Sequence, residues 1–117
     1  MISVRADLKI WVASKPVDFR RGMNGLAALV AESLASNPYS GDVFIFRSKR
    51  SDRLKLIFWD GSGMVLVSKV LEDRRFTWPT IRDGAVHLNP SEMALLLDGL
   101  DWTKVVSKPV KRPIKIS

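Results

Sequence analysis

Apolar residues follow a period of two through the middle of the chain, which predicts β-strands. Two segments with this pattern, residues 42–47 and 53–59, are joined by residues 48–52, a length that suits a hairpin. The turn at residues 60–63 holds two glycines, and residues 64–70 return as a third apolar segment. The pattern therefore predicts an antiparallel β-meander.

Helical spacing occurs on both sides of this meander. A helix that follows the meander is predicted to begin after Asn89, which can cap it, with Pro90 at its first position and Glu92 at its third. Gly99 is expected to end that helix, because glycine readily adopts the left-handed conformation of a helix stop. The first helix is predicted over residues 23–35 from apolar residues at helical spacing: Leu26, Leu29, Val30 and Leu34.

Shorter apolar segments at residues 8–13, 76–78 and 85–88 predict further strands. We therefore expect an α+β fold, with an antiparallel β-meander of about four to six strands and two helices. Both faces of the meander carry apolar residues, so we expect the helices on one face and more of the chain, or a second copy in a homodimer, on the other. The predicted domain organisation is a single domain over residues 1–103 and a basic, proline-containing flexible tail over residues 104–117.

The composition excludes several classes of protein. The 117 residues include no cysteine and one histidine, His87, so the chain has no disulfides, no thiolate nucleophile and no zinc finger. No signal peptide or membrane-spanning stretch is recognisable, so we expect a cytoplasmic protein without membrane contact. No motif for a cofactor is present, since Gly61 and Gly63 lack the Lys-Ser/Thr of a nucleotide site.

Positive charge is the main functional signal. Lys and Arg exceed Asp and Glu by 19 to 12, which gives a net charge of +7, and clustered positive charge attracts polyanions such as DNA. The basic residues form a hairpin cluster, two doublets and a tail group. We predict DNA contacts at Arg47, Lys49, Arg50, Arg53 and Lys55, at Arg20, Arg21, Arg74 and Arg75, and at Lys108, Lys111 and Arg112.

The hairpin also suggests a register. If Arg47 pairs with Arg53, Phe46 faces Leu54 and one face of the hairpin is wholly apolar. Two like charges directly opposite each other are unfavourable unless an anion lies between them or the side chains splay into water. This register therefore predicts a phosphate-facing hairpin tip.

Catalytic chemistry has weaker support in the sequence. Four acids are candidates for a two-metal site, but turns often recruit aspartate for local hydrogen bonds, so we assign them structural roles: Asp18, Asp60, Asp83 and Asp101. His87 has no visible partner that would make it a general base. The four tryptophans are expected in the core or an interface rather than stacked on bases: Trp11, Trp59, Trp78 and Trp102.

Strings along nearly the whole chain then point to one family. They are residues 18–26 (DFRRGMNGL), 44–47 (FIFR), 52–55 (DRLK), 59–63 (WDGSG), 69–72 (KVLE), 75–79 (RFTWP) and 96–102 (LLDGLDW). In this order and spacing the chain resembles the accessory protein encoded by the second reading frame of a bacterial insertion-sequence family, insertion sequence sixty-six. The family usually has a glycine on each side of the arginine pair at the hairpin tip, where this chain has Ser48 and Ser51.

The resemblance implies an accessory factor for transposition that works with a separate, larger transposase and its DNA, and its members are not known as enzymes. We therefore expect a non-catalytic protein that binds DNA through the basic hairpin and tail. One alternative is an adaptor that docks on the transposase without touching DNA, through an apolar face around Ile57, Trp59, Met64 and Leu66. A second alternative is a small metal-dependent nuclease, for which the sequence shows no acidic constellation.

Overall fold

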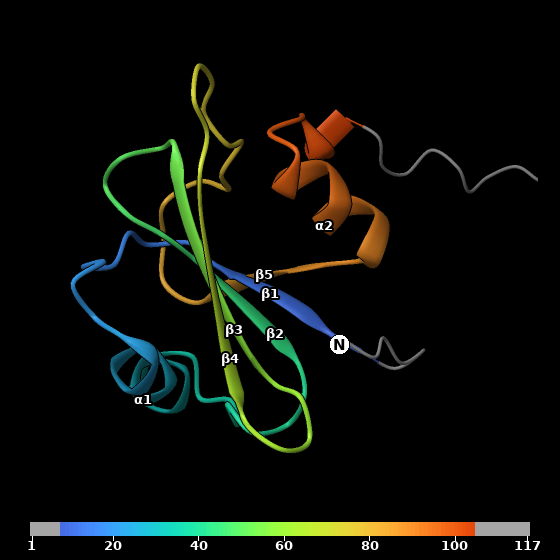
Figure 1. Ribbon diagram of the computed structural model, residues 1–117. Coiled ribbons are helices and arrows are strands. Elements are labelled where there is room, and N and C mark those ends of the chain that lie inside the picture. The colour runs from blue at the N-terminus through green and yellow to red at the C-terminus, as the bar shows by residue number, and fades with distance from the viewer. Residues whose placement is uncertain (1–7, 105–117) are drawn as a thin grey trace, which may run out of the picture.

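The computed structural model describes residues 8–104, which form one sheet between two helices (Figure 1). In chain order, the elements are β1 (Ile10–Ala13), α1 (Met23–Ser33), β2 (Val43–Arg47), β3 (Arg53–Trp59), β4 (Met64–Val70), β5 (Ala85–Leu88), α2 (Pro90–Leu97) and the short 3₁₀ helix η1 (Trp102–Lys104).

The five strands form a single sheet in the order β4-β3-β2-β1-β5. Strands β2, β3 and β4 pair antiparallel, so the predicted meander and the α+β fold are confirmed. Strand β1 lies between β2 and β5, parallel to β2 and antiparallel to β5. One parallel pair therefore makes the sheet mixed rather than wholly antiparallel.

The bounds of the later strands were predicted correctly from the turn residues between them. Strands β3, β4 and β5 begin and end where the sequence pattern predicts. The strand predicted at residues 76–78 is wrong, because this segment does not join the sheet. Instead, the Phe76 N–H donates a hydrogen bond of 3.0 Å to the Ser51 carbonyl in the β2–β3 loop, and the Phe76 side chain is buried in the core.

Each face of the sheet is covered by one helix (Figure 1), which corrects the expectation that both helices cover the same face. Because strand residues alternate between faces, Phe44 and Phe46 pack toward α1, whereas Val43 and Ile45 pack toward α2. Trp102 of η1 completes the core on the α2 side. The chain itself therefore buries both apolar faces of its sheet.

The register predicted for the hairpin is wrong by one residue. Arg47 lies opposite Leu54 rather than Arg53, and Phe46 lies opposite Lys55. A shift of one residue moves every side chain of a strand to the other face. Because both faces are apolar, the shift keeps each face buried, and it also avoids placing two arginines directly opposite each other.

The helix ends follow the predicted signals closely. Asn89 caps α2: its side chain accepts a hydrogen bond of 2.8 Å from the Glu92 N–H, and the Glu92 carboxylate accepts one of 2.8 Å from the Asn89 N–H. Gly99 follows the helix with a φ of 74°, the left-handed conformation expected there. Helix α1 ends at Ser33, two residues before the predicted end at residue 35.

Neither helix in residues 8–104 has the length and apolar character needed to cross a bilayer.

Candidate nucleic-acid interface

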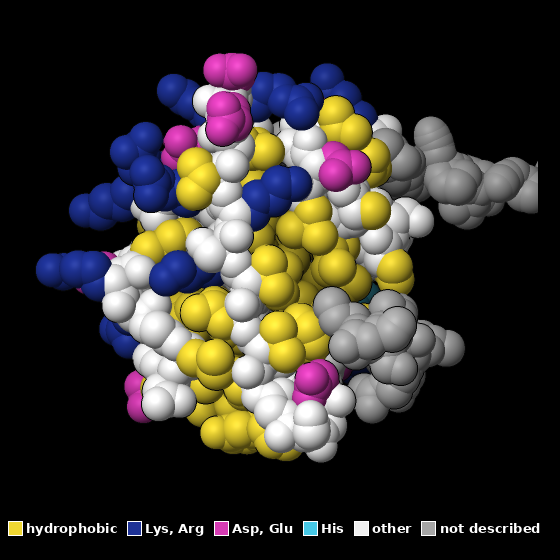
Figure 2. Space-filling view, in the orientation of Figure 1, with side chains coloured by type: hydrophobic (Ala, Val, Ile, Leu, Met, Phe, Trp, Pro, Cys, Tyr) yellow, Lys and Arg dark blue, Asp and Glu magenta, His cyan; other side chains and the backbone are white. Residues whose placement is uncertain are grey.

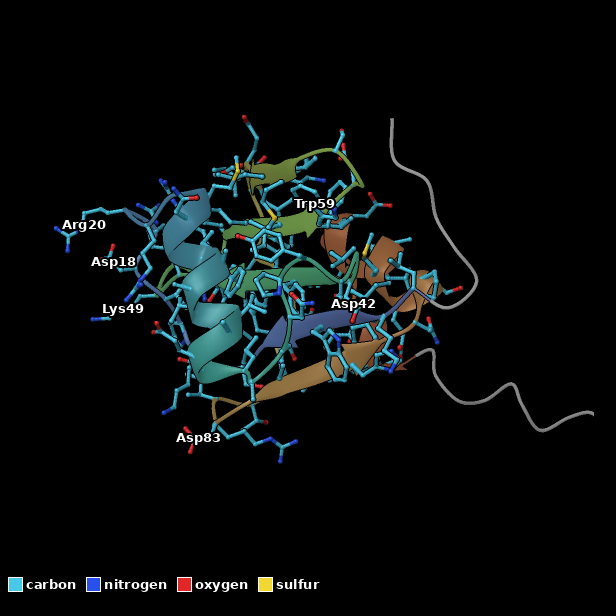
Figure 3. The ribbon with its side chains drawn as sticks, turned by 90° about the horizontal axis from the view of Figure 1, so that it is seen from below. Asp18, Arg20, Asp42, Lys49, Trp59 and Asp83 are labelled. Atoms are coloured by element: carbon cyan, nitrogen blue, oxygen red, sulfur yellow. The ribbon has the colours of Figure 1, made fainter. Side chains whose placement is uncertain are left out.

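Three loops meet at one end of the sheet and carry most of the predicted DNA contacts. In Figure 2, Lys and Arg side chains gather at the left and top of the view, over these loops. In Figure 3, Arg20 and Lys49 lie together at this end, whereas Trp59 and Asp42 lie toward the other end. We call this surface the basic end and define it by Arg20, Arg21, Lys49, Arg50, Arg53, Arg74 and Arg75.

Two clefts flank the β2–β3 loop in the basic end. The first, of about 580 Å³, lies between the β1–α1 loop and the β2–β3 loop and is lined by Phe19, Arg20 and Arg53 among others. The second, of about 450 Å³, lies between the β2–β3 loop and the β4–β5 connection and is lined by Arg74 and Arg75. Lys49 and Arg50 line both clefts, so they form a ridge between them.

Hydrogen bonds hold the β2–β3 loop in one shape. The Ser48 hydroxyl accepts a bond of 3.0 Å from the Arg50 N–H and donates one of 3.0 Å to the Arg50 carbonyl. The Ser51 carbonyl accepts two hydrogen bonds, one of 3.0 Å from the Phe76 N–H and one of 3.1 Å from the Trp78 indole Nε1. The loop therefore presents Lys49 and Arg50 to solvent from a fixed backbone.

Carboxylates neutralise only part of this charge. Asp52 lies between Arg50 and Arg53, with N···O distances of 3.4 and 3.8 Å. Lys49 and Arg75 are exposed and take part in none of the ion pairs found within residues 8–104. Both contacts are longer than a normal charge-assisted hydrogen bond, so a phosphate could compete with Asp52 for both arginines.

Arg20 is held by the acid beside it. Its Nη2 lies 2.7 Å from the Asp18 carboxylate, and its Nε donates a second bond of 3.0 Å to the same oxygen. These hydrogen bonds from the Arg20 side chain, with one from its backbone, lower the pKa of Asp18 to about 2. The Arg20 side chain remains 91% exposed, so it is accessible to a ligand.

Arg74 and Arg21 complete the basic end. Arg74 is exposed and donates a weak hydrogen bond of 3.3 Å to the Asp98 carbonyl, just after α2. Arg21 is exposed beside the start of α1. Helix α1 has no side-chain cap and no acid in its first turn, so the partial positive charge of its N-terminus adds to that of the arginines.

Two of the predicted DNA contacts, Arg47 and Lys55, bind other parts of the fold, and Arg47 is buried. Arg47 is only 9% exposed, lies over the Trp78 ring and donates to the Pro79 carbonyl, and its burial lowers its pKa. The Lys55 ammonium donates to the carbonyls of Phe19 (2.8 Å) and Arg21 (3.2 Å). These two side chains therefore position the loops of the basic end instead of projecting from it.

The tail residues predicted to contact DNA, Lys108, Lys111 and Arg112, lie outside the described residues. Lys104, at the predicted start of the tail, belongs to η1 and lies 3.8 Å from the Asp101 carboxylate.

The four candidate catalytic acids form hydrogen bonds or ion pairs within the fold, and those of Asp18 are described above. Asp60 accepts hydrogen bonds of 2.9 Å from the N–H groups of Ser62 and Gly63, which lower its pKa. Asp83 forms an ion pair of 2.6 Å with Lys15, and Asp101 accepts a hydrogen bond of 3.0 Å from the Thr103 N–H. Within residues 8–104, no three His, Asp or Glu side chains are grouped so that they could hold a metal ion.

The apolar face suggested for an adaptor is partly covered by α1. Ile57 is fully buried, and Met64 and Leu66 pack against the core beneath α1. Trp59 meets Tyr39 edge-on, with 5.6 Å between the ring centres, and Tyr39 is exposed. This face is therefore covered at Ile57 and half-exposed at Trp59, Met64 and Leu66, and its use in protein docking stays a prediction.

Sequence reasoning missed two features of the basic end. One is the apolar wall of the first cleft, formed by Pro16, Val17 and Phe19. The other is the support that Trp78 gives to the β2–β3 loop. The segment that contains Phe19 and the segment that contains Trp78 were visible as strings, residues 18–26 and 75–79, but only the folded chain brings them to the hairpin.

The fold and the site together define a small basic α+β protein with its positive charge concentrated at one end of a mixed sheet. The family model described as IS66 Orf2 like protein matches residues 8–107, so the chain belongs to this family, whose members are accessory proteins of transposition. The resemblance noted in the sequence is therefore confirmed.

Several relatives are similar to this chain. Uncharacterized protein y4jC of Sinorhizobium fredii is 57% identical over 117 residues, which are all of both chains. Uncharacterized protein y4hO of the same organism is 37% identical over 102 residues, 87% of this chain and 89% of the relative. Homogentisate 1,2-dioxygenase of Pseudomonas fluorescens is 31% identical over 101 residues, but these are only 21% of that enzyme. No solved structure matches the chain.

Proposed function

We propose that this protein assists transposition without catalysing a reaction, by binding DNA phosphates at its basic end. The observation that carries the proposal is the ridge of Lys49 and Arg50, which is exposed, held by a hydrogen-bonded loop and flanked by two clefts. Because the loop backbone is already held, only the Lys49 and Arg50 side chains lose conformational freedom when they meet a phosphate. The separate transposase would cut and join the DNA.

Phosphate contacts of this kind carry no sequence information directly. Each contact releases counterions condensed on the DNA, so affinity should fall steeply as salt concentration rises. A bound phosphate would draw Arg50 and Arg53 away from Asp52, whose contacts with them are long. We therefore propose that the protein binds DNA of many sequences and that the transposase determines which site is used.

Fluorescence anisotropy with a labelled DNA duplex, titrated at several salt concentrations, tests this proposal. Replacing both ridge residues (Lys49→Ala with Arg50→Ala) should weaken binding about tenfold and reduce the salt slope by about two, one for each lost contact. Lys9→Ala is the matched control, because Lys9 is an exposed lysine beside Asp42, toward the other end of the sheet. Failure of the wild-type protein to bind at moderate salt, or equal losses in both variants, would overturn the proposal.

A further inference from the structure

The first cleft of the basic end has two chemically different walls. Phe19, with Val17 and Pro16, forms an apolar wall on the β1–α1 loop. Across from it, the β2–β3 hairpin contributes Arg53 together with the Lys49–Arg50 ridge. A continuous duplex offers a protein surface mainly phosphates, which would leave the apolar wall without a partner.

The charge balance sets this cleft apart from the second one. Among the described residues, Asp18 is the only acid that lines the first cleft, and Asp18 is bound by Arg20. The second cleft is lined by three acids beside its basic residues: Asp52, Glu72 and Asp73. An anion therefore meets more uncompensated positive charge in the first cleft than in the second.

Arg53 adds an unsatisfied donor next to this cleft. Its Nε and the Asp52 Oδ1 are both buried, lie 3.8 Å apart, and have no hydrogen-bond partner within residues 8–104. Unsatisfied buried groups are costly, so a ligand that reorganises the Arg53 guanidinium recovers part of that cost.

Phe19 is held in place at the other wall. The Phe19 carbonyl accepts a hydrogen bond of 2.8 Å from the Lys55 ammonium. The same ammonium lies 5.2 Å from the centre of the Phe19 ring. The ring is partly buried against the α1 side of the core and partly exposed to the cleft. An aromatic ring beside basic side chains is the arrangement by which proteins bind unpaired bases and their phosphates.

We infer that the first cleft takes an unpaired nucleotide of DNA, with its base against Phe19 and its phosphate against Lys49, Arg50 and Arg53. This inference rests on the proposed function and narrows it: the preferred DNA carries a single-stranded segment, such as a gap or an overhang. The volume of about 580 Å³ lies within the range of pockets that hold small organic ligands.

The test compares three labelled DNAs in anisotropy titrations: a duplex, the same duplex with a short internal gap, and its isolated strand. The wild-type protein should bind the gapped duplex and the single strand about fivefold or more tightly than the intact duplex, because stacking on one base is worth about that factor. Phe19→Leu should remove most of this preference and leave affinity for the intact duplex within about twofold. Phe19→Tyr, which keeps the ring, should retain the preference.

Each result has a distinct meaning. Equal affinity of the wild-type protein for all three DNAs overturns this inference and leaves the proposed function standing. An equal loss of affinity for all three in Phe19→Leu also overturns it, since the ring would then act only by shaping the loop. Absence of binding to any of the three DNAs overturns the proposed function itself.

Discussion

The guanidinium carbon of Arg47 lies 5.3 Å from the centre of the Trp78 ring, and its Nη1 donates to the Pro79 carbonyl over 3.4 Å. Arg47 comes from the end of β2, whereas Trp78 and Pro79 belong to the segment between β4 and β5. This contact ties that segment to the β2–β3 hairpin. It gives a residue predicted to bind phosphate a role within the fold.

Replacing Arg47 should therefore reduce stability. Arg47→Ala is expected to lower the free energy of unfolding by about 2 kcal/mol, because a desolvated cation–π contact and a buried side-chain stem are lost together. Arg47→Lys should cost about half as much, since it keeps the charge but loses the flat contact with the ring. Urea unfolding followed by tryptophan fluorescence measures both.

Arg75→Ala is the control for this series, because Arg75 is exposed and should change stability by less than about 0.5 kcal/mol. DNA affinity of Arg47→Lys, measured where the variant is folded, should match that of the wild-type protein. If Arg47→Lys lost DNA affinity but kept its stability, Arg47 would contact phosphate directly, contrary to this account.

Asp18 binds the guanidinium of Arg20, so a DNA phosphate at the basic end would have to displace it. Asp18→Asn removes the negative charge that holds the Arg20 guanidinium, so affinity for duplex DNA should rise about two- to fivefold, which corresponds to the worth of an exposed ion pair. The salt slope should become steeper as well, because one more cation meets phosphate. Anisotropy titration checks both, with Asp60→Asn as a control, because the Asp60 carboxylate accepts hydrogen bonds from the Ser62 and Gly63 N–H groups of its own turn. Unchanged affinity in Asp18→Asn would show that Arg20 lies outside the contact surface.

The Asp18 carboxylate also makes the stability of the folded protein depend on pH in the acid range. The pKa of Asp18 is about 2 in the folded protein, below its ordinary value, because Arg20 binds the ionised form. A lowered folded pKa stabilises the native state above the unfolded pKa, and this contribution is lost as the pH falls toward 2. Asp18→Asn should therefore lose less stability than the wild-type protein between pH 4 and 2. Parallel acid unfolding curves for the two proteins would contradict this assignment.

Gly99 is the position where an added methyl group should be least tolerated. Its φ of 74° is unfavourable for other residues, and a Cβ there would lie 2.9 Å from a methyl carbon of Leu71. Gly99→Ala should destabilise the protein by about 1 to 2 kcal/mol, measured by urea unfolding. Gly63→Ala serves as the control, because its Cβ would meet open space. Equal effects of the two substitutions would contradict this account of the α2 end.

Much of the fold was readable because the signals are local. Strands β3 and β4 are separated by the turn at residues 60–63, and α2 begins with a complete capping box. Each of these signals acts within a few residues, so no knowledge of the rest of the chain is needed. Grouping the basic residues near the β2–β3 loop follows from the same hairpin pattern.

Register and burial were harder to predict because they depend on distant segments. With apolar residues on both faces, alternation alone fits either register of the hairpin, so it could not predict that Arg47 lies opposite Leu54. The burial of Arg47 needs Trp78, and the position of Lys55 needs the carbonyls of Phe19 and Arg21. Sequence spacing shows none of these contacts.

The place of β1 between β2 and β5 has a consequence for how the chain assembles. Pairs such as Ile10 with Leu88 join the two ends of the described chain, whereas the β2–β3–β4 hairpins close short loops. Closing a long loop costs entropy before its contacts form, so we expect the hairpins to fold first and β1 to dock late with β5. During synthesis, the basic hairpin would then be shaped before the sheet that supports it is complete.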